Sequence, residues 1–304
     1  WMGDEHPLPL QNGTQTESYI PVKEIRIPVN RAKVIANGTV DTSEKVTILP
    51  EIRFSLGKER SRLIKDEIAI LDIIASNDWD RPIYFAVTCK PDKTLGLKDY
   101  MQLEGMALRL LPVKTRSDGN LGFIGSGRIA ADKTYDNIMN KFKWGNFDKE
   151  DLFVDRSYLP SVLSMRLTFF RLARHYINTG ETEKAGQVLD KYFEAYPHMN
   201  FPYDYNVMML INEYYRGGMA EKAKPHVEIL AEELSQYMNF YRSLSPDDLG
   251  SFRYDVQQSQ RTVDNLYRAV EQNDEAFKKG IQDKLNPYKT QQQPGVEGVR
   301  PPGQ

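Results

Sequence analysis

The chain has 304 residues, of which 40% are hydrophobic and 11% aromatic, so it is long enough for two domains with cores of their own. Forty basic and 42 acidic residues leave a net charge of −2, which argues against general nucleic-acid binding and against a polybasic membrane patch. No window reaches the roughly 18 to 20 unbroken apolar residues of a membrane helix, so no direct membrane insertion by this chain is expected.

An α/β domain is expected over residues 20–157, after an irregular arm over residues 1–19 that is rich in proline, glycine and polar residues. Alternating or continuous apolar residues predict strands over 24–27, 46–56, 83–87 and 106–113. Amphipathic stretches predict helices over 61–76, 97–104 and 136–142. Asn37-Gly38, between the first two strands, predicts a hairpin turn.

The corner between the first long helix and the buried strand at 83–87 is unusually dense in functional side chains. Trp79 and Arg81 flank Asp80 there, on the kind of loop that often carries function. An Arg81 side chain held by Asp78 or Asp80 can recognise an anionic group. The same side chain can equally fix the helix-to-strand corner, and the sequence favours this structural interpretation.

From about residue 160 to 285 the period of apolar residues is helical almost without interruption. Helix pairs are expected over 161–179 with 183–195, over 203–216 with 220–238, and, less regularly, over 250–271 with 275–285. These pairs define a helical domain over residues 158–288. The segment 289–304 is rich in Gln, Pro and Gly, and is expected to be a disordered tail.

Two of these pairs share the spacing of small and large residues that is typical of tetratricopeptide-like repeats. The first pair has Phe169, Leu172, Ala173, Tyr176, Gly180, Ala185 and Pro197, and the second has Val207, Leu210, Tyr214, Gly218 and Ala223. Small residues allow close helix contact and large ones fill the space between helices. The predicted fold is therefore α+β and multidomain, a small α/β domain followed by an all-α tetratricopeptide-like domain of helical hairpins. A generic helical bundle is the alternative.

In such repeats the first helix of each pair lines a concave face, and repeats of this type usually bind a partner. Projected onto this face, the candidate binding residues are Phe170, Arg174, Tyr205, Asn212 and Tyr215. Aromatic rings beside Arg and Asn can hold a peptide or a glycan, because the rings stack and the polar groups make directed hydrogen bonds. These residues can equally pack against the α/β domain or against a partner subunit.

Catalytic and metal-binding motifs are absent from the sequence. The four histidines are scattered, Gly-x-Ser-x-Gly does not occur, and residues 122–128 match a phosphate-binding loop so loosely that a flexible turn is expected. Cys89 is the single cysteine, which excludes an internal disulfide, and its place after an apolar run predicts a buried side chain. No catalytic residue, metal or cofactor is expected in this chain.

Three segments carry a resemblance to a known family: residues 77–85 (NDWDRPIYF), 99–112 (DYMQLEGMALRLLP) and 142–146 (FKWGN). They resemble the soluble C-terminal portion of the domain-of-unknown-function family numbered 2723, large membrane proteins common in Bacteroidetes, and the resemblance spans about residues 19–288. The N-terminal part of that family is a membrane region similar to glycosyltransferases of the GT-C class. A eukaryotic relative is a protein O-mannosyltransferase.

The resemblance implies a parent enzyme that moves a sugar from a polyprenyl-phosphate donor to a protein or glycan outside the cytoplasmic membrane. Its catalytic carboxylates lie in the membrane region and match no residue here. This chain is then expected to be a non-catalytic periplasmic domain, tethered to the membrane through its parent. Its partners would be an acceptor protein or glycan and the parent's own membrane region. The alternatives are a free-standing carbohydrate-binding or hydrolytic domain and a structural cap on the membrane region.

Overall fold

The structure is a computed structural model that describes residues 7–9, 16–18, 22–41, 46–55, 63–89 and 91–288. The tail expected over 289–304 lies outside the described residues, and of the arm expected over 1–19 only two short strands are described. These strands, β1 (Pro7–Pro9) and β2 (Thr16–Ser18), pair antiparallel.

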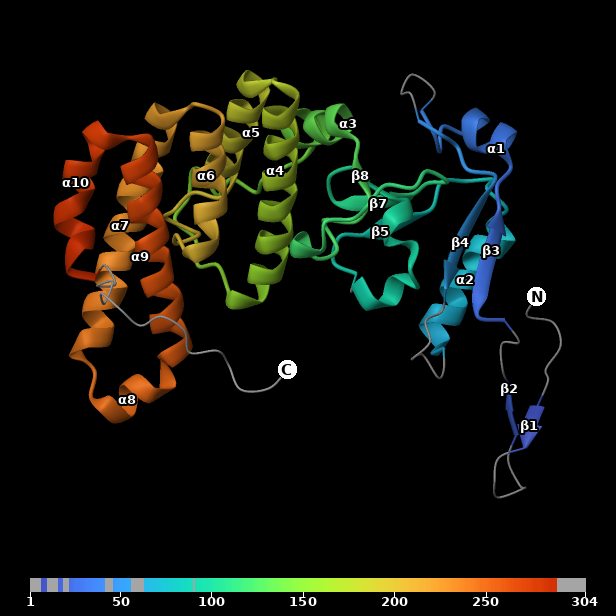
Figure 1. The fold of residues 1–304 in the computed structure, drawn as a ribbon, viewed down its shortest axis with the longest axis horizontal. Coiled ribbons are helices and arrows are strands. Elements are labelled where there is room, and N and C mark those ends of the chain that lie inside the picture. Colours follow the sequence, from blue (N-terminus) through green and yellow to red (C-terminus); the bar gives the residue numbers. More distant parts are fainter. Residues whose placement is uncertain are drawn as a thin grey trace, which may run out of the picture. The chain divides into compact units, whose positions relative to one another are not determined.

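The expected fold class is confirmed, because a small N-terminal region of sheets is followed by a long series of helices (Figure 1). The chain forms two compact units. The first unit comprises residues 1–143 and 155–172, and the second comprises residues 144–154 and 173–304. The division falls within helix α4 (Leu159–Thr179), so each unit holds one part of that helix.

In the first unit, β3 (Glu24–Pro28) and β4 (Glu51–Ser55) pair antiparallel, but the predicted hairpin turn at Asn37-Gly38 is wrong. The connection contains helix α1 (Arg31–Ala36), whose N-terminus is capped by Asn30. Asn37 caps the other end, and Gly38 has a φ of 70°. An Asn-Gly pair suits a helix C-terminus for the same reason as a hairpin turn, since both need a residue that tolerates positive φ.

Helix α2 (Lys65–Asn77) occupies most of the predicted helix and begins with a hydrogen bond from the Ile64 N–H to the Glu67 carboxylate. A four-stranded sheet follows, in the order β5-β7-β6-β8. Its strands are β5 (Tyr84–Ala86), β6 (Met101–Leu103), β7 (Ala107–Leu110) and β8 (Arg128–Ile129). Strand β8 runs parallel to β6, and the other neighbours are antiparallel.

The helix predicted over 97–104 is wrong in its second half. Only η2 (Leu97–Tyr100) is helical, and the chain then enters strand β6. Residues 101–103 pair with β7 on one side and β8 on the other. The periodicity of this short apolar run fits a helix or a strand, and the hydrogen bonds to the two neighbouring strands make it a strand. The strand predicted over 46–56 is also shorter, because β4 begins only after Pro50.

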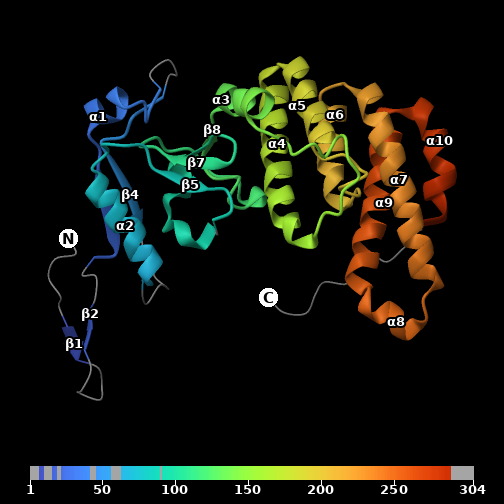
Figure 2. The same ribbon diagram turned by 180° about the vertical axis from the view of Figure 1, so that it is seen from behind.

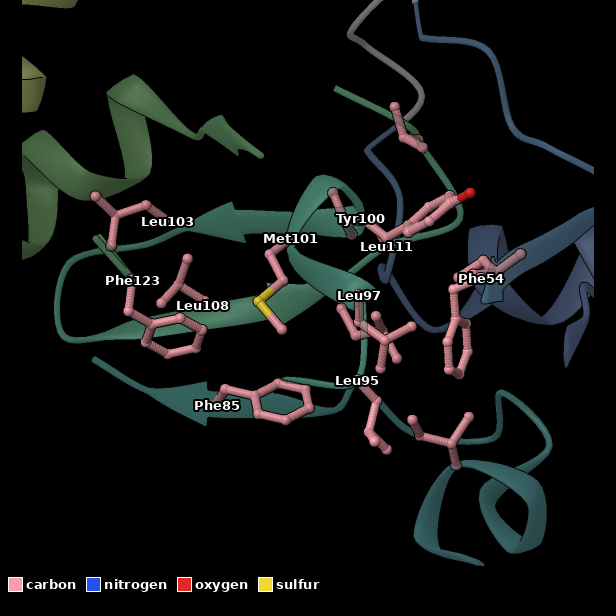
Figure 3. Packing of buried hydrophobic residues seen from close by; sticks show 14 of the residues in the cluster. Phe54, Phe85, Leu95, Leu97, Tyr100, Met101, Leu103, Leu108, Leu111 and Phe123 are labelled. Atoms are coloured by element: carbon pink, nitrogen blue, oxygen red, sulfur yellow. The ribbon is translucent and has the colours of Figure 1, made fainter. Parts of the chain in front are cut away.

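One face of the four-stranded sheet forms the core of the first unit. Met101, Leu103 and Leu108 are fully buried there, with Phe85 beside them on the neighbouring strand (Figure 3). Leu97 and Phe54 extend this cluster towards β4. Helix α3 (Ala131–Asp136) and the π-helical turn η4 (Asn137–Lys141) follow the sheet, where a single short helix was expected over 136–142.

The second unit consists of antiparallel helices joined by short turns (Figures 1 and 2). They are α5 (Thr182–Ala195), α6 (Met208–Arg216), α7 (Ala220–Ser243), α8 (Pro246–Ser251), α9 (Arg253–Asn273) and α10 (Glu275–Leu285), with short turns η6 (Tyr205–Val207) and η7 (Asn286–Tyr288). Gly180 and Gly218 have φ values of 83° and 72° at two of the turns. Ala173, Ala185 and Ala223 are fully buried, as close helix contact requires.

Candidate functional site

The corner that holds Trp79 and Arg81 is hydrogen-bonded to strand β3 and to the end of helix α1. Trp79 is buried, and its indole Nε1 donates to the Pro28 carbonyl at 2.7 Å, while its own carbonyl accepts from the Asn37 side chain at 2.7 Å. Asp78 and Trp79 both have positive φ, 43° and 61°. Such backbone strain persists only where the surroundings fix it, and here the two hydrogen bonds of Trp79 do so.

Lys33, on α1, is the cation that pairs with both aspartates of this corner. Its ammonium lies 2.8 Å from the Asp78 carboxylate and 2.6 Å from the Asp80 carboxylate, and these bonds raise its pKa. Arg81 is exposed, and its backbone exchanges two hydrogen bonds of 2.9 Å with the Asn77 side chain. The structure thus places Trp79 in the packing between α2 and β3 and leaves Arg81 at the surface.

A buried ionic network, which the sequence did not predict, lies on the other face of the four-stranded sheet. Tyr84, Arg109 and Gln102 are directly opposite one another on β5, β7 and β6, so their side chains share one face. Glu104, just after β6, accepts from Gln102 at 2.9 Å and pairs with Arg109 at 3.0 Å and with Lys133 at 2.6 Å. The carboxylate is therefore engaged by two cations and stabilises the sheet.

The glycine-bearing loop after β7 presents carbonyl oxygens, not N–H groups, to a partly buried cation. The guanidinium of Arg171, in the part of α4 that belongs to the first unit, donates to the carbonyls of Ile124, Ser126 (3.1 Å) and Gly127 (2.6 Å). Burial lowers the pKa of Arg171 to about 10, so it stays charged at neutral pH. Because a phosphate-binding loop must offer N–H donors, this arrangement is structural.

The five residues predicted for a concave helical face differ in exposure. Phe170, in the first unit, is buried. In the second unit, Arg174 donates to the fully buried Glu213 carboxylate at 2.8 Å, and Arg216 pairs with the same carboxylate at 2.9 Å. Tyr215 is buried, which raises its pKa to about 12. Only Tyr205 and Asn212 are exposed.

Tyr205 belongs to a second set of aromatic residues that the sequence did not group. We call this set the tyrosine surface, and it comprises Tyr205, Tyr237, Phe240, Tyr241, Phe252 and Tyr254. Burial raises the pKa of Tyr205, and its neighbour Tyr254 at the start of α9 adds to this shift. Tyr237 stacks on Tyr241 with ring centroids 6.5 Å apart, and the Phe240 and Phe252 rings lie 5.6 Å apart. Figures 1 and 2 show the end of α7, α8 and the start of α9 together at one end of the helices.

Four members of the tyrosine surface are open to solvent. Tyr205, Tyr237, Phe240 and Tyr254 expose 44%, 41%, 47% and 61% of their surfaces. Single exposed aromatic residues are ordinary, but a contiguous group usually marks a binding site. The surface offers flat apolar rings and phenolic hydroxyls, which is a composition suited to recognition.

A pocket of about 350 Å³ lies on α8 and α9, lined by Leu249, Arg253, Val256, Gln257, Gln260, Arg261 and Asp264. None of the residues predicted from the sequence lines it. Within the described ranges, no group of three or more His, Cys, Asp or Glu side chains is placed to hold a metal ion.

Comparison with known proteins gives one match. Residues 3–133, less than half of the chain, match the family model described as TMEM260-associated domain 2. No curated protein and no solved structure matches the chain. Among the helices that the structure describes, none combines the length and apolar character required to cross a membrane.

Proposed function

We propose that this chain is a non-catalytic, extracytoplasmic recognition domain of a membrane glycosyltransferase. In this proposal it binds an acceptor protein or glycan and positions it beside the membrane-embedded active site of its parent. The matched family model supports the link to such a parent, because TMEM260 is a glycosyltransferase-like membrane protein. The resemblance to the family numbered 2723 supports the same parent and a periplasmic location.

The tyrosine surface is the observation that carries the recognition role. Four exposed aromatic side chains from three separate segments belong to it, and two of them, Tyr237 and Phe240, are held by ring contacts to a neighbour. Exposing so much aromatic area is unfavourable unless a partner covers it.

A transfer assay tests the proposal. The isolated chain is incubated with a polyprenyl-phosphate sugar donor and candidate acceptors, and the same reaction is run with the complete membrane protein. We expect transfer only by the complete protein, together with binding of its acceptor by the isolated chain. Sugar transfer or hydrolysis by the isolated chain would contradict the proposal and favour a free-standing enzyme. Absence of acceptor binding by the chain would favour the structural cap.

A further inference from the structure

Helix α9 presents one of its faces to the pocket that it forms with α8. Arg253, Gln257 and Arg261 recur every fourth residue, so they follow one another along that face. Val256 beside them and Leu249 of α8 are partly buried and supply the apolar part of the lining. With a volume of about 350 Å³ the pocket lies at the lower end of the range for ligand sites, so it fits a small molecule or a few residues of a chain.

The two arginines of this pocket are exposed cations without a counter-charge. Neither the guanidinium of Arg253 nor that of Arg261 forms an ion pair or a hydrogen bond with any residue that the structure describes. Arg109 and Arg174, by contrast, each pair with a buried glutamate. Asp264 is the acid among the lining residues, so the lining carries a net positive charge. A guanidinium presents a planar fork of N–H donors that matches a carboxylate.

The spacing of the two arginines selects what they can bind together. Arg253 and Arg261 are eight positions apart on one α-helix, which corresponds to about 12 Å along its axis. Long side chains on a helix lean towards its N-terminus, so both guanidiniums are displaced in the same direction and keep this separation. One small anion therefore meets only one of them. In an extended polypeptide, residues i and i+4 are about 13 Å apart and point to the same side, so two acidic side chains at these positions match both arginines.

We propose that this pocket binds an extended segment of a protein that carries two acidic side chains four residues apart. The residue midway between them points to the same side and lies against Val256 and Leu249, so it is apolar. A neutral glycan also accepts hydrogen bonds from arginine, but it lacks the charge-assisted bonds of a carboxylate, which are roughly twice as strong. The inference goes beyond the proposed function, because it depends neither on the tyrosine surface nor on sugar transfer.

Calorimetric titration of the full chain with short peptides tests this proposal. The probe contains Glu-Gly-Leu-Gly-Glu between Gly-Ser ends that are acetylated and amidated. One control replaces both glutamates by glutamine, and a second has the order Glu-Leu-Glu-Gly-Gly, which places the same two carboxylates only two residues apart. We expect the probe to bind at least about tenfold more tightly than the glutamine peptide and about threefold more tightly than the reordered peptide. Its affinity should fall as salt is added.

Variants locate the binding. Arg253→Gln and Arg261→Gln are each expected to weaken binding of the probe about fivefold to tenfold, because each variant leaves one carboxylate without its cation. Both side chains are exposed, so the fold should be retained, and circular dichroism checks this. The matched control is Arg268→Gln, because Arg268 is exposed on the same helix but does not line the pocket. Tyr237→Ala should leave binding unchanged, which separates this site from the tyrosine surface.

Four results would overturn the proposal. The first is equal binding of the glutamate and glutamine peptides, and the second is equal binding of the probe and the reordered peptide, which would mean that one arginine acts alone. The third is a loss in Arg268→Gln as large as in the two pocket variants, which would indicate attraction by the charge of the whole chain. The fourth is a loss in Tyr237→Ala, which would move the binding to the tyrosine surface. The transfer assay of the proposed function is independent of all four.

Discussion

Glu104 is the residue on which the polar face of the four-stranded sheet depends. Its side chain is almost fully buried and pairs with Arg109, which is also buried. Glu104→Gln removes the counter-charge and leaves a buried guanidinium, so we expect a loss of about 3 kcal/mol in the free energy of unfolding. Urea denaturation followed by circular dichroism measures it. Glu24→Gln is the control, since the exposed Glu24–Arg26 pair should contribute less than about 1 kcal/mol. Equal losses would contradict the assigned role.

His226 makes stability depend on pH. It stacks on Phe193 with ring centroids 3.5 Å apart, hydrogen-bonds to Tyr203 at 2.9 Å, and burial lowers its pKa from 6.5 to about 4. Above pH 6.5 this histidine is neutral in both the folded and the unfolded chain, and it does not change the free energy of unfolding. Between pH 6.5 and 4 the unfolded chain takes up a proton that the folded chain does not. The free energy of unfolding therefore falls by about 3 kcal/mol over this range.

The matched variant is His226→Phe, which retains the ring stack but cannot titrate. Chemical denaturation at pH 7.5 and pH 5 should show a smaller loss of stability on acidification for the variant than for the original chain. The comparison of the two slopes is independent of any constant destabilisation caused by losing the bond to Tyr203. Identical slopes would show that His226 is not held neutral by burial.

At the residue scale, sequence reasoning recognised Trp79 as unusual but not its partner. The hydrogen bond to Pro28 joins residues 51 positions apart, and no local pattern encodes such a pair. The ionic network of Glu104 was missed for a different reason. In a helix over 97–104, Gln102 and Glu104 would lie on different faces, whereas strand geometry places them on the same face. Because this segment was predicted as a helix, the contact between Gln102 and Glu104 was not recognised from the sequence.

At the scale of elements, two glycines of the loop before β8 have the same strained backbone but differ in what an added Cβ would meet. Gly122 and Gly127 both have positive φ, 55° and 50°. A Cβ on Gly122 meets no atom within 4 Å, whereas one on Gly127 would lie 2.0 Å from the Met101 carbonyl oxygen. Gly122→Ala should cost about 1 kcal/mol, and Gly127→Ala at least about 2 kcal/mol more because β6 must shift. Thermal unfolding of both variants tests this order, and a reversed order would contradict it.

The helices were predicted more accurately than the strands. Helix α5 begins and ends within a residue of its expectation, because its periodicity is local and Gly180 ends the preceding helix with positive φ. Strands depend on pairing between distant segments. The strand expected at β4 was therefore predicted too long, and β6 was predicted as part of a helix. Helix α7 continues to Ser243, beyond the predicted end at 238. This extension places Phe240 and Tyr241 on a helix that packs near α9, where a loop was expected.

At the scale of the whole molecule, we propose that recognition lies on a surface with residues from three segments of the second unit. Sequence reasoning identified Tyr205 as a binding candidate but could not identify Tyr237, Phe240 or Tyr254, because their convergence depends on how α7, α8 and α9 pack. The match to a TMEM260-associated domain covers only residues of the first unit. The two observations are independent, and together they motivate a recognition domain attached to a membrane glycosyltransferase.

The most direct test of acceptor binding by the tyrosine surface is a measurement of the steady-state kinetics of sugar transfer. It uses the complete membrane protein carrying Tyr237→Ala and Tyr254→Ala together. A recognition surface outside the active site contributes to acceptor binding and not to the chemical step. We therefore expect the KM for the acceptor to rise at least about tenfold with kcat unchanged, while Phe153→Ala alters neither. An unchanged KM, or a fall in kcat at constant KM, would contradict the account.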